Sequence, residues 1–157
     1  MYNMYPLMFN LDRKVIVIVG GGKIAYRKAS GLKDTGAFVT VISPEICEEM
    51  TELPYITWKQ KPFSNDDIKD AHLIYAATNQ HAVNMMVKQA AHDFQWVNVV
   101  SDGTESSFHT PGVIRNDDSV VTISTSGKDP SFTKRMKQEL TSILPKLIKK
   151  LSRTHKS

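Results

Sequence analysis

The sequence is short of cysteine and of long hydrophobic runs. Its 157 residues include one cysteine, Cys47, so an internal disulfide is excluded, as is usual for proteins of the reducing cytoplasm. No apolar stretch approaches the roughly 20 residues that a membrane-spanning helix requires. The first residues lack the basic leader and apolar core of a secretory signal. We therefore expect a cytoplasmic protein without a membrane partner, in which Cys47 is small and half-buried.

Acidic residues are scarce in the last thirty positions, and this accounts for the net charge of +4. Residues 1–127 hold 11 lysines and arginines against 14 aspartates and glutamates, whereas residues 128–157 hold 9 against 2. Such a tail binds nucleic acid, a membrane surface or an anionic small molecule, or it is a solvated helix face. No recognition motif or set of stacking aromatic residues supports nucleic acid as the partner.

Strand-like and helix-like segments alternate through the first hundred residues. The predicted strands cover residues 14–19, 37–42, 55–60, 72–77 and 96–100, and the predicted helices cover residues 23–35 and 80–92. Nearly continuous apolar strands separated by helices predict a parallel sheet that is covered on both faces. Residues 1–113 are therefore expected to form a Rossmann-type, doubly wound α/β domain. Met85 and Met86 are expected in its core.

The pattern changes in the last third of the chain. Residues 119–124 predict one further strand, and a basic amphipathic helix begins near Pro130 with Asp129 as its N-cap. Its apolar stripe consists of Phe132, Met136, Leu140, Ile143 and Leu147. Pro145 should kink or restart this helix, because proline donates no backbone hydrogen bond. The stripe packs on the sheet or on a second copy across a two-fold axis, and we favour a homodimer that is built by residues 114–157.

Three glycines join the first strand to the first helix. Gly20, Gly22 and Ala25 satisfy the pattern G-x-G-x-x-A between a strand and a helix. Gly20 permits the tight turn, Gly22 lets a pyrophosphate approach the backbone, and Ala25 lets the helix pack closely. The helix begins at Lys23 and Ile24, where free N–H groups favour an anion. The pattern predicts a dinucleotide-binding loop.

The type of dinucleotide depends on the residues after the second strand. The usual acidic partner of the ribose is replaced by Ser43, which is followed by Pro44 and Glu45. Serine does not repel a phosphate, so this position alone does not separate NAD from NADP, but no arginine stands beside it and NAD is favoured. Glu45 either reaches the ribose or faces water. Thr78 and Asn79, after the fourth strand, are expected to line the nicotinamide end.

Four segments carry a family resemblance in order along nearly the whole chain. They read GGGKIAYRKASGLKDTGAFVTVISPE from Gly20, AATNQHAVN at 76–84, VNVVSDGTESSFHTP at 97–111 and ISTSGKDPSFTKRMKQEL at 123–140. The chain resembles the precorrin-2 dehydrogenase domain of the siroheme synthases. The resemblance implies oxidation of precorrin-2 to sirohydrochlorin with NAD as hydride acceptor. It also implies a segment that dimerises by exchange between subunits, and a downstream chelatase as a further partner.

The sequence departs from the family pattern in two places. It ends about where the family's helical domain begins, so that domain is absent or truncated. The family's acid after VNVV corresponds to Ser101, with Asp102 one position later. Both departures argue against a bifunctional dehydrogenase and ferrochelatase, and we expect no metal site. The alternatives are that bifunctional enzyme, a non-catalytic module that binds NAD for regulation or binds nucleic acid, and a methyltransferase.

Candidate residues for proton transfer lie in the region that follows the carboxyl ends of the strands, where open α/β sheets bind ligands. The reaction needs no strong base, and if a protein base acts, the catalytic candidates are Asp102, His109 and Ser124. They offer a carboxylate, an imidazole and a hydroxyl, and Ser124 matches the family's substrate-site serine in the resemblance. Asp102 in a DG turn is otherwise a turn former, and His109 a loop histidine. The resemblance implies a substrate that carries many carboxylates. The residues expected to bind it are Thr125, Lys128, Lys134 and Arg135.

Overall fold

The chain folds as two compact units. A computed structural model describes residues 4–116 and 119–154. The first unit is Met1–Phe108 and the second is His109–Ser157. The sequence suggests a boundary after residue 113, a little later than this division. The difference arises from a strand that the sequence pattern does not reveal, which begins at Gly112 and pairs only within the second unit.

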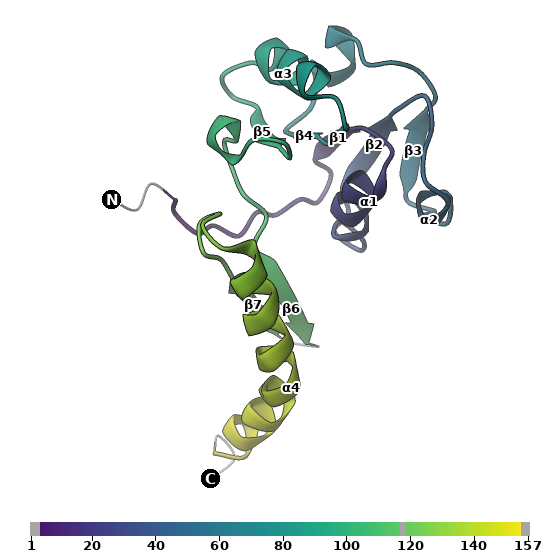
Figure 1. The fold of residues 1–157 in the computed structure, drawn as a ribbon. Helices are drawn as coiled ribbons and strands as arrows, with labels where there is room; N and C mark the ends of the chain where they lie inside the picture. Colours follow the sequence, from purple (N-terminus) through teal and green to yellow (C-terminus); the bar gives the residue numbers. More distant parts are fainter. Residues whose placement is uncertain (1–3, 117–118, 155–157) are drawn as a thin grey trace. The chain divides into compact units, whose positions relative to one another are not determined.

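Five parallel strands form the sheet of the first unit, in the order β3-β2-β1-β4-β5 (Figure 1). The strands are β1 (Val15–Val19), β2 (Phe38–Ile42), β3 (Ile56–Lys59), β4 (Leu73–Ala76) and β5 (Trp96–Val99). Strand β1 pairs with β2 on one side and with β4 on the other, so that Val19 aligns with both Ile42 and Ala76. The strand order reverses at β1, and open α/β sheets bind ligands at such a switch point. The predicted Rossmann-type doubly wound sheet is confirmed.

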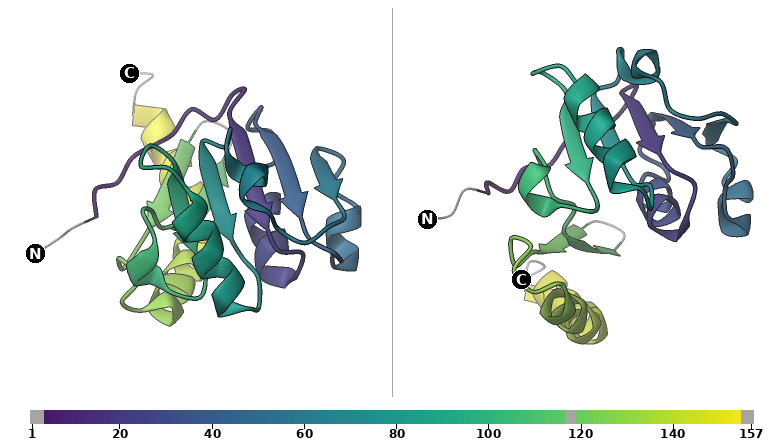
Figure 2. Two further views of the ribbon diagram at one scale, coloured as in Figure 1. Left: turned by 90° about the horizontal axis from the view of Figure 1, so that it is seen from above. Right: turned by 45° about the horizontal axis from the view of Figure 1, so that its top comes forward.

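Helices cover both faces of this sheet, as Figure 2 shows. They are α1 (Lys23–Ser30), α2 (Glu48–Thr51) and α3 (His81–Ala90), with 3-10 turns η1 (Asn65–Ile68) and η2 (Gly103–Glu105). Side chains alternate along β1, so Ile16 and Ile18 pack with Ala25 of α1, whereas Val17 and Val19 belong to the core on the α3 side. Burial on both faces explains why the strand is an unbroken apolar run.

Two expectations about the helices of this unit are wrong in detail. The first helix ends at Ser30 rather than near residue 35, because Gly31 closes it and Asp34 adopts a positive φ of 59°. Met86 is 52% exposed rather than buried. The inward side of α3 is formed by Val87, as the apolar spacing predicts, and by Asn84; both are fully buried, and Met85 is half-buried.

In the second unit a hairpin packs against one long helix. Strands β6 (Gly112–Asn116) and β7 (Ser119–Ile123) are antiparallel, and Ile114 and Ile123 are buried on the hairpin that α4 (Pro130–Thr154) contacts. The strand at 119–124 and the basic helix were predicted, whereas β6 was not. No helix in the described part of the chain is both long and apolar enough to cross a membrane.

Helix α4 starts as predicted but passes through its proline. The backbone N–H of Phe132 donates to Oδ1 of Asp129 at 2.8 Å, which confirms the N-cap. The helix does not restart at Pro145, since its ribbon is unbroken in Figure 1. Several apolar side chains of α4 are about half exposed, at 45% to 56%. They are Phe132, Ile143, Leu147 and Leu151.

Candidate functional site

The three glycines after β1 have three different environments. Gly20 has a positive φ of 122°, and a Cβ there would overlap the carbonyl group of Ala77 at the end of β4. A Cβ on Gly21 would overlap the carbonyl oxygen of Glu45. At Gly22 no atom of the described residues would lie within 4 Å of a Cβ. Close packing inside the protein therefore requires the first two glycines, whereas the third leaves space for a ligand.

The first turn of α1 faces that space with unpaired backbone donors. Gly22 is the N-cap of α1 and, as glycine, offers no capping side chain. The first turn holds no acidic residue, and its Lys23 and Ile24 side chains are exposed. An anion beside Gly22 would meet these N–H groups and the positive end of the helix dipole. The arrangement fits the pyrophosphate of a dinucleotide.

The loop after β2 is fixed against the glycine loop by backbone contacts. Ser43 is 9% exposed, and its carbonyl oxygen accepts a hydrogen bond from Nε1 of Trp58 at 2.9 Å. The N–H of Cys47, which is half-buried as expected, donates to the carbonyl of Gly21 at 2.7 Å. The side chains of Pro44 and Glu45 are exposed. The loop therefore places the Ser43 hydroxyl beside the glycine loop and leaves the Glu45 carboxylate in water.

A polar network lies at the carboxyl ends of β4 and β5. We call Thr78, His81, Asn84 and Ser101 the Asn84 network. The buried amide of Asn84 accepts from the N–H of Thr78 at 3.0 Å and from its hydroxyl at 2.7 Å. Its Nδ2 donates to the carbonyl of Thr78 at 3.1 Å and to Oγ of Ser101 at 3.2 Å. Nδ1 of His81 lies 3.2 Å from the same Oγ.

The network adjoins the glycine loop through one residue. Ala77 contacts Gly20, and the next residue is Thr78, whose side chain is engaged within the turn. Asn79 is exposed beside it. Thr78 and Asn79 therefore lie at the edge of the sheet where the nicotinamide end was expected. His81 and Asn84 were not predicted as site residues, although both belong to the AATNQHAVN segment.

Asp102 holds a turn rather than standing free. Its Oδ1 accepts hydrogen bonds from the N–H of Thr104 at 2.9 Å and from the Thr104 hydroxyl at 2.6 Å. These bonds hold the pKa of Asp102 below its ordinary value, and the charge of His81 lowers it further. Nearby, the side-chain amide of Asn98 donates to the carbonyl of Phe108 at 2.9 Å, which fits the structural role typical of a buried asparagine.

The second unit contains the remaining catalytic candidates. His109 lies beside Gly127, where a Cβ would be 3.3 Å from the imidazole Cε1. Ser124 follows β7, and its hydroxyl accepts from the N–H of Ser126 at 3.0 Å. The hydroxyl of Thr125 accepts from the N–H of Asp129 at 3.0 Å, so it helps to hold the start of α4.

The basic candidates of this unit lie on the outside of α4 and just before it. Lys128, Lys134 and Arg135 are all exposed. The guanidinium carbon of Arg135 lies 5.9 Å from the ring centroid of Phe132, one turn earlier. Three cationic side chains near one helix start provide positive charge that is accessible to an anion.

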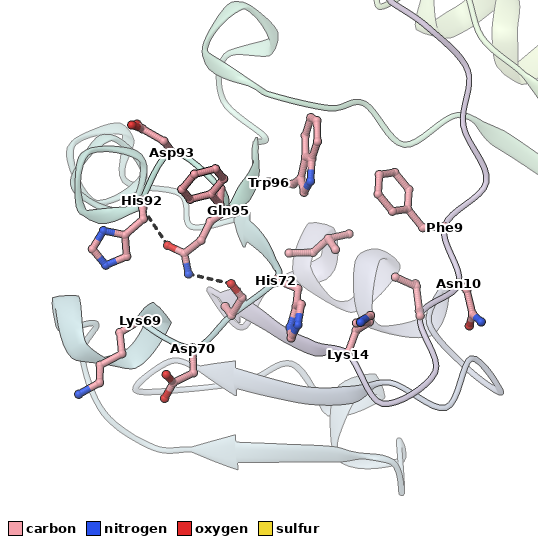
Figure 3. A pocket seen from close by; sticks show the side chains of 14 residues that line it. Phe9, Asn10, Lys14, Lys69, Asp70, His72, His92, Asp93, Gln95 and Trp96 are labelled. Carbon is pink, nitrogen blue, oxygen red and sulfur yellow. Dashed lines mark hydrogen bonds between the residues drawn. The ribbon is translucent and has the colours of Figure 1, made fainter.

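A separate cavity of about 770 Å³ lies in the first unit at the amino ends of the parallel strands, which we call the amino edge of the sheet (Figure 3). The carboxyl ends of the strands are called the carboxyl edge. Phe9 and Trp96 meet edge to face there, with ring centroids 6.1 Å apart. Nδ1 of His72 accepts the N–H of Val15 at 3.1 Å, and the amide of Gln95 donates to the carbonyls of Ile68 and Ala71. The side chains of His72 and Gln95 therefore satisfy backbone groups beside the cavity.

No three His, Cys, Asp or Glu side chains gather as a metal site within residues 4–116 and 119–154.

Known proteins share this glycine loop and sheet. A family model described as NAD(P)-binding matches residues 7–112. The precorrin-2 dehydrogenase of Bacillus subtilis (strain 168) is 34% identical over 144 residues, which cover 90% of this chain and 89% of that protein. This chain belongs to the precorrin-2 dehydrogenase family. The resemblance inferred from the four segments is confirmed, and the Rossmann domain of this family member is an NAD(P)-binding domain.

Other relatives are longer than this chain. Siroheme synthase 3 of Aeromonas hydrophila is 37% identical over 89% of this chain, but the match spans 31% of that synthase. The solved structure of SirC, a precorrin-2 dehydrogenase, matches with a TM-score of 0.80 and 33% identity, and covers 88% of this chain and 70% of that chain. The match to SirC extends beyond the Rossmann unit into the hairpin and helix.

Proposed function

We propose that this protein oxidises precorrin-2 to sirohydrochlorin, with NAD as the hydride acceptor. The observation that carries the proposal is the open space at Gly22, in front of the uncapped start of α1. A glycine that no internal packing requires, at the start of a helix after a buried strand, fits the approach of a pyrophosphate. The relatives named precorrin-2 dehydrogenase supply the substrate.

NAD supplies a hydride acceptor when it is bound, and the protein supplies its position. In this proposal the pyrophosphate is held by Gly20, Gly22, Lys23 and Ile24. The loop after β2 holds the adenosine ribose through Ser43, Pro44 and Glu45. Thr78 and Asn79 hold the nicotinamide end. Ser43 alone does not distinguish NAD from NADP. The neighbouring carboxylate of Glu45 favours NAD, because it would repel the 2′-phosphate of NADP.

The substrate and proton-transfer roles belong to the same proposal. Lys128, Lys134 and Arg135, with Thr125, are proposed to bind the substrate carboxylates, because a cationic helix start favours anions. Asp102, His109 and Ser124 stay as predicted proton-transfer candidates. A Lys134→Ala, Arg135→Ala double variant should raise the Michaelis constant for precorrin-2 while the affinity for NAD is kept. An unchanged Michaelis constant would contradict the binding role.

We infer that the protein works as a cytoplasmic homodimer whose product passes to a chelatase. The exposed apolar side chains of α4, among them Ile143 and Leu147, support a second copy as the partner. A Leu147→Asp variant should shift the mass measured by light scattering from that of a dimer to that of a monomer. Equal masses for the variant and the unmodified protein would contradict this role of α4.

The test of cofactor binding uses two glycines. In Gly22→Ala the added methyl group enters the space left for the pyrophosphate, so the Kd for NAD should rise at least tenfold, about 1.4 kcal/mol. The free energy of unfolding should fall by only about 1 kcal/mol, the cost of alanine at an N-cap, because the methyl group meets no described atom. Gly31→Ala is the matched control, since its Cβ would lie at an ordinary 3.5 Å from two helix carbonyls and far from the loop in the chain.

The decisive assay is NADH formation. The unmodified protein should produce NADH and sirohydrochlorin from enzymatically prepared precorrin-2 and NAD, and this should be followed by absorbance. No turnover with either NAD or NADP would contradict the proposed function. Wild-type affinity for NAD in Gly22→Ala would contradict the proposed position of the cofactor.

A further inference from the structure

His81 is held at the carboxyl edge of the sheet by a side chain that is itself fixed. Asn84 is fully buried, and both of its amide hydrogens are used, one by Thr78 and one by Ser101. Its oxygen accepts two bonds from Thr78, so the amide has one orientation. It therefore holds Oγ of Ser101 in place. That oxygen lies 3.2 Å from Nδ1 of His81.

The hydrogen bond to Ser101 leaves the far side of the imidazole available. When Nδ1–H donates to Oγ of Ser101, the lone pair of Nε2 is free, and the His81 side chain is exposed. Protonation at Nε2 keeps the bond to Ser101. Asp102 lies on the turn after β5, and its electrostatic interaction with His81 lowers its pKa. The Asp102 carboxylate would therefore stabilise the imidazolium of His81 once Nε2 has taken up a proton.

The position relative to the cofactor loop also fits. Gly20 lies against Ala77, and Thr78 is the next residue, so the Asn84 network starts one residue from the glycine loop. Asp102 offers a weaker base at this edge, because Thr104 already donates two hydrogen bonds to its Oδ1. His81 has no such donor to Nε2 among the interactions of the described residues.

We propose that Nε2 of His81 accepts the proton that is released in the dehydrogenation, with Ser101 and Asn84 as positioning residues. The proposal rests on the proposed function. The reaction removes two hydrogens from the substrate. One leaves carbon with its electron pair as a hydride, for which NAD is the oxidant. The other leaves as a proton, its bond pair enters the new double bond, and a bond from Nε2 to this hydrogen forms before the proton passes to water.

The test compares two exposed histidines of the same unit. His81→Ala should lower kcat at least a hundredfold, the lower range for general acid–base catalysis. Its Kd for NAD and its melting temperature should stay within error, because the side chain is exposed. Added imidazole should restore turnover in a concentration-dependent way. His92→Ala, at the opposite edge of the sheet, is the matched control and should keep full turnover.

Ser101 gives an independent readout of positioning. Ser101→Ala should lower kcat about tenfold without changing the Kd for NAD, and Ser101→Thr, which keeps a hydroxyl, should restore most of the loss. Free imidazole should not rescue Ser101→Ala, because its own imidazole is present. Rescue of most of the loss by threonine, but not by imidazole, is the result expected of a positioning residue.

The outcomes separate the two proposals. An inactive unmodified protein would overturn both the proposed function and the role of His81. An active protein in which His81→Ala keeps kcat within twofold would overturn the role of His81 alone. So would a His81→Ala variant whose lost turnover imidazole does not restore, because the side chain would then act through structure.

Discussion

The amino and carboxyl ends of the strands in the five-stranded sheet differ in shape and in chemistry. The amino edge, where the strands begin, holds the cavity of about 770 Å³, which is lined by aromatic side chains such as Phe9 and Trp96. The carboxyl edge holds the glycine loop and the Asn84 network. The cavity therefore lies away from the glycine loop and the Asn84 network.

The direction of the backbone explains this difference. In a parallel βαβ arrangement every helix begins at the carboxyl edge, so α1 and α3 both present N–H groups there. At the amino edge the chain presents carbonyl groups, and the amide of Gln95 is used to satisfy two of them. An anionic cofactor therefore meets the starts of two helices at the carboxyl edge, whereas the helices end toward the amino edge. The following variants test how far this contrast extends.

The largest expected effect is at Gly20. Gly20→Ala places a Cβ against the Ala77 carbonyl and imposes a positive φ on alanine. The free energy of unfolding should fall by roughly 2–6 kcal/mol, the sum of backbone strain and overpacking. Urea denaturation measures it, with Gly31→Ala as the control. A loss below about 0.5 kcal/mol would contradict close packing between β1 and β4 at this edge.

A smaller effect is expected from Asn84. Asn84→Ala leaves buried groups of Thr78 without partners and frees Ser101, so the free energy of unfolding should fall by about 2–4 kcal/mol. Asn79→Ala is the control, since Asn79 is exposed on the same edge. Denaturation curves of equal stability for the two variants would contradict a structural role of the Asn84 network.

The connection between β3 and β4 should respond to acid through Asp67 of η1. Burial raises the pKa of Asp67, but hydrogen bonds from Lys61 and Ser64 outweigh this and lower it overall. The pKa of Asp67 is lower in the folded protein than in the unfolded chain, where it is about 3.9, so the carboxylate stabilises the fold above about pH 3.9. This stability is lost as the pH falls through the pKa that Asp67 has in the folded protein. Asp67→Asn should cost about 1 kcal/mol at pH 7, and the difference should close below about pH 4.

Urea midpoints at pH 7 and at acid pH measure the effect of Asp67. A difference that persists unchanged into acid would mean that the carboxylate charge contributes nothing. Asp66→Asn is a suitable control, because Asp66 precedes Asp67 in η1 and is exposed.

The smallest effect is expected at Phe94, beside the cavity. Its side chain is 95% exposed, so Phe94→Ala should change the free energy of unfolding by less than about 0.5 kcal/mol. Turnover of precorrin-2 should be unchanged. A tenfold loss of turnover would show that the amino edge takes part in the reaction, and the contrast between the edges would fail.

Most of the fold could be predicted because the strands are apolar runs with clear ends. Strand β6 was missed because its sequence, GVIRN, holds a glycine and an arginine and buries only Ile114 well. The end of α1 was placed too late because the apolar Leu32, which is buried, continues the helical spacing after the helix has ended. Local pattern does not distinguish a buried turn from a buried helix.

Candidate site residues could be predicted where their role depends on their own backbone and on the residues next to them in the sequence. Gly20 and Gly22 follow from a local pattern, but the role of Gly21 depends on the loop after β2, which folds against it. Asn84 was missed because a polar residue in a helix is expected to face water. Ser101, which accepts a hydrogen bond from it, lies in the turn after β5. Contacts between distant segments of the chain require the folded sheet.

The central position of β1 has a consequence for folding during synthesis. Its sequence, VIVIV, is apolar and β-branched, without charge or proline, which is the type of segment that aggregates when its edge is unpaired. Strand β2 covers one side as soon as Phe38–Ile42 has been made, but the other side waits for Leu73–Ala76. In that interval the nascent chain carries a strand with one unpaired side, which is prone to pair with another chain.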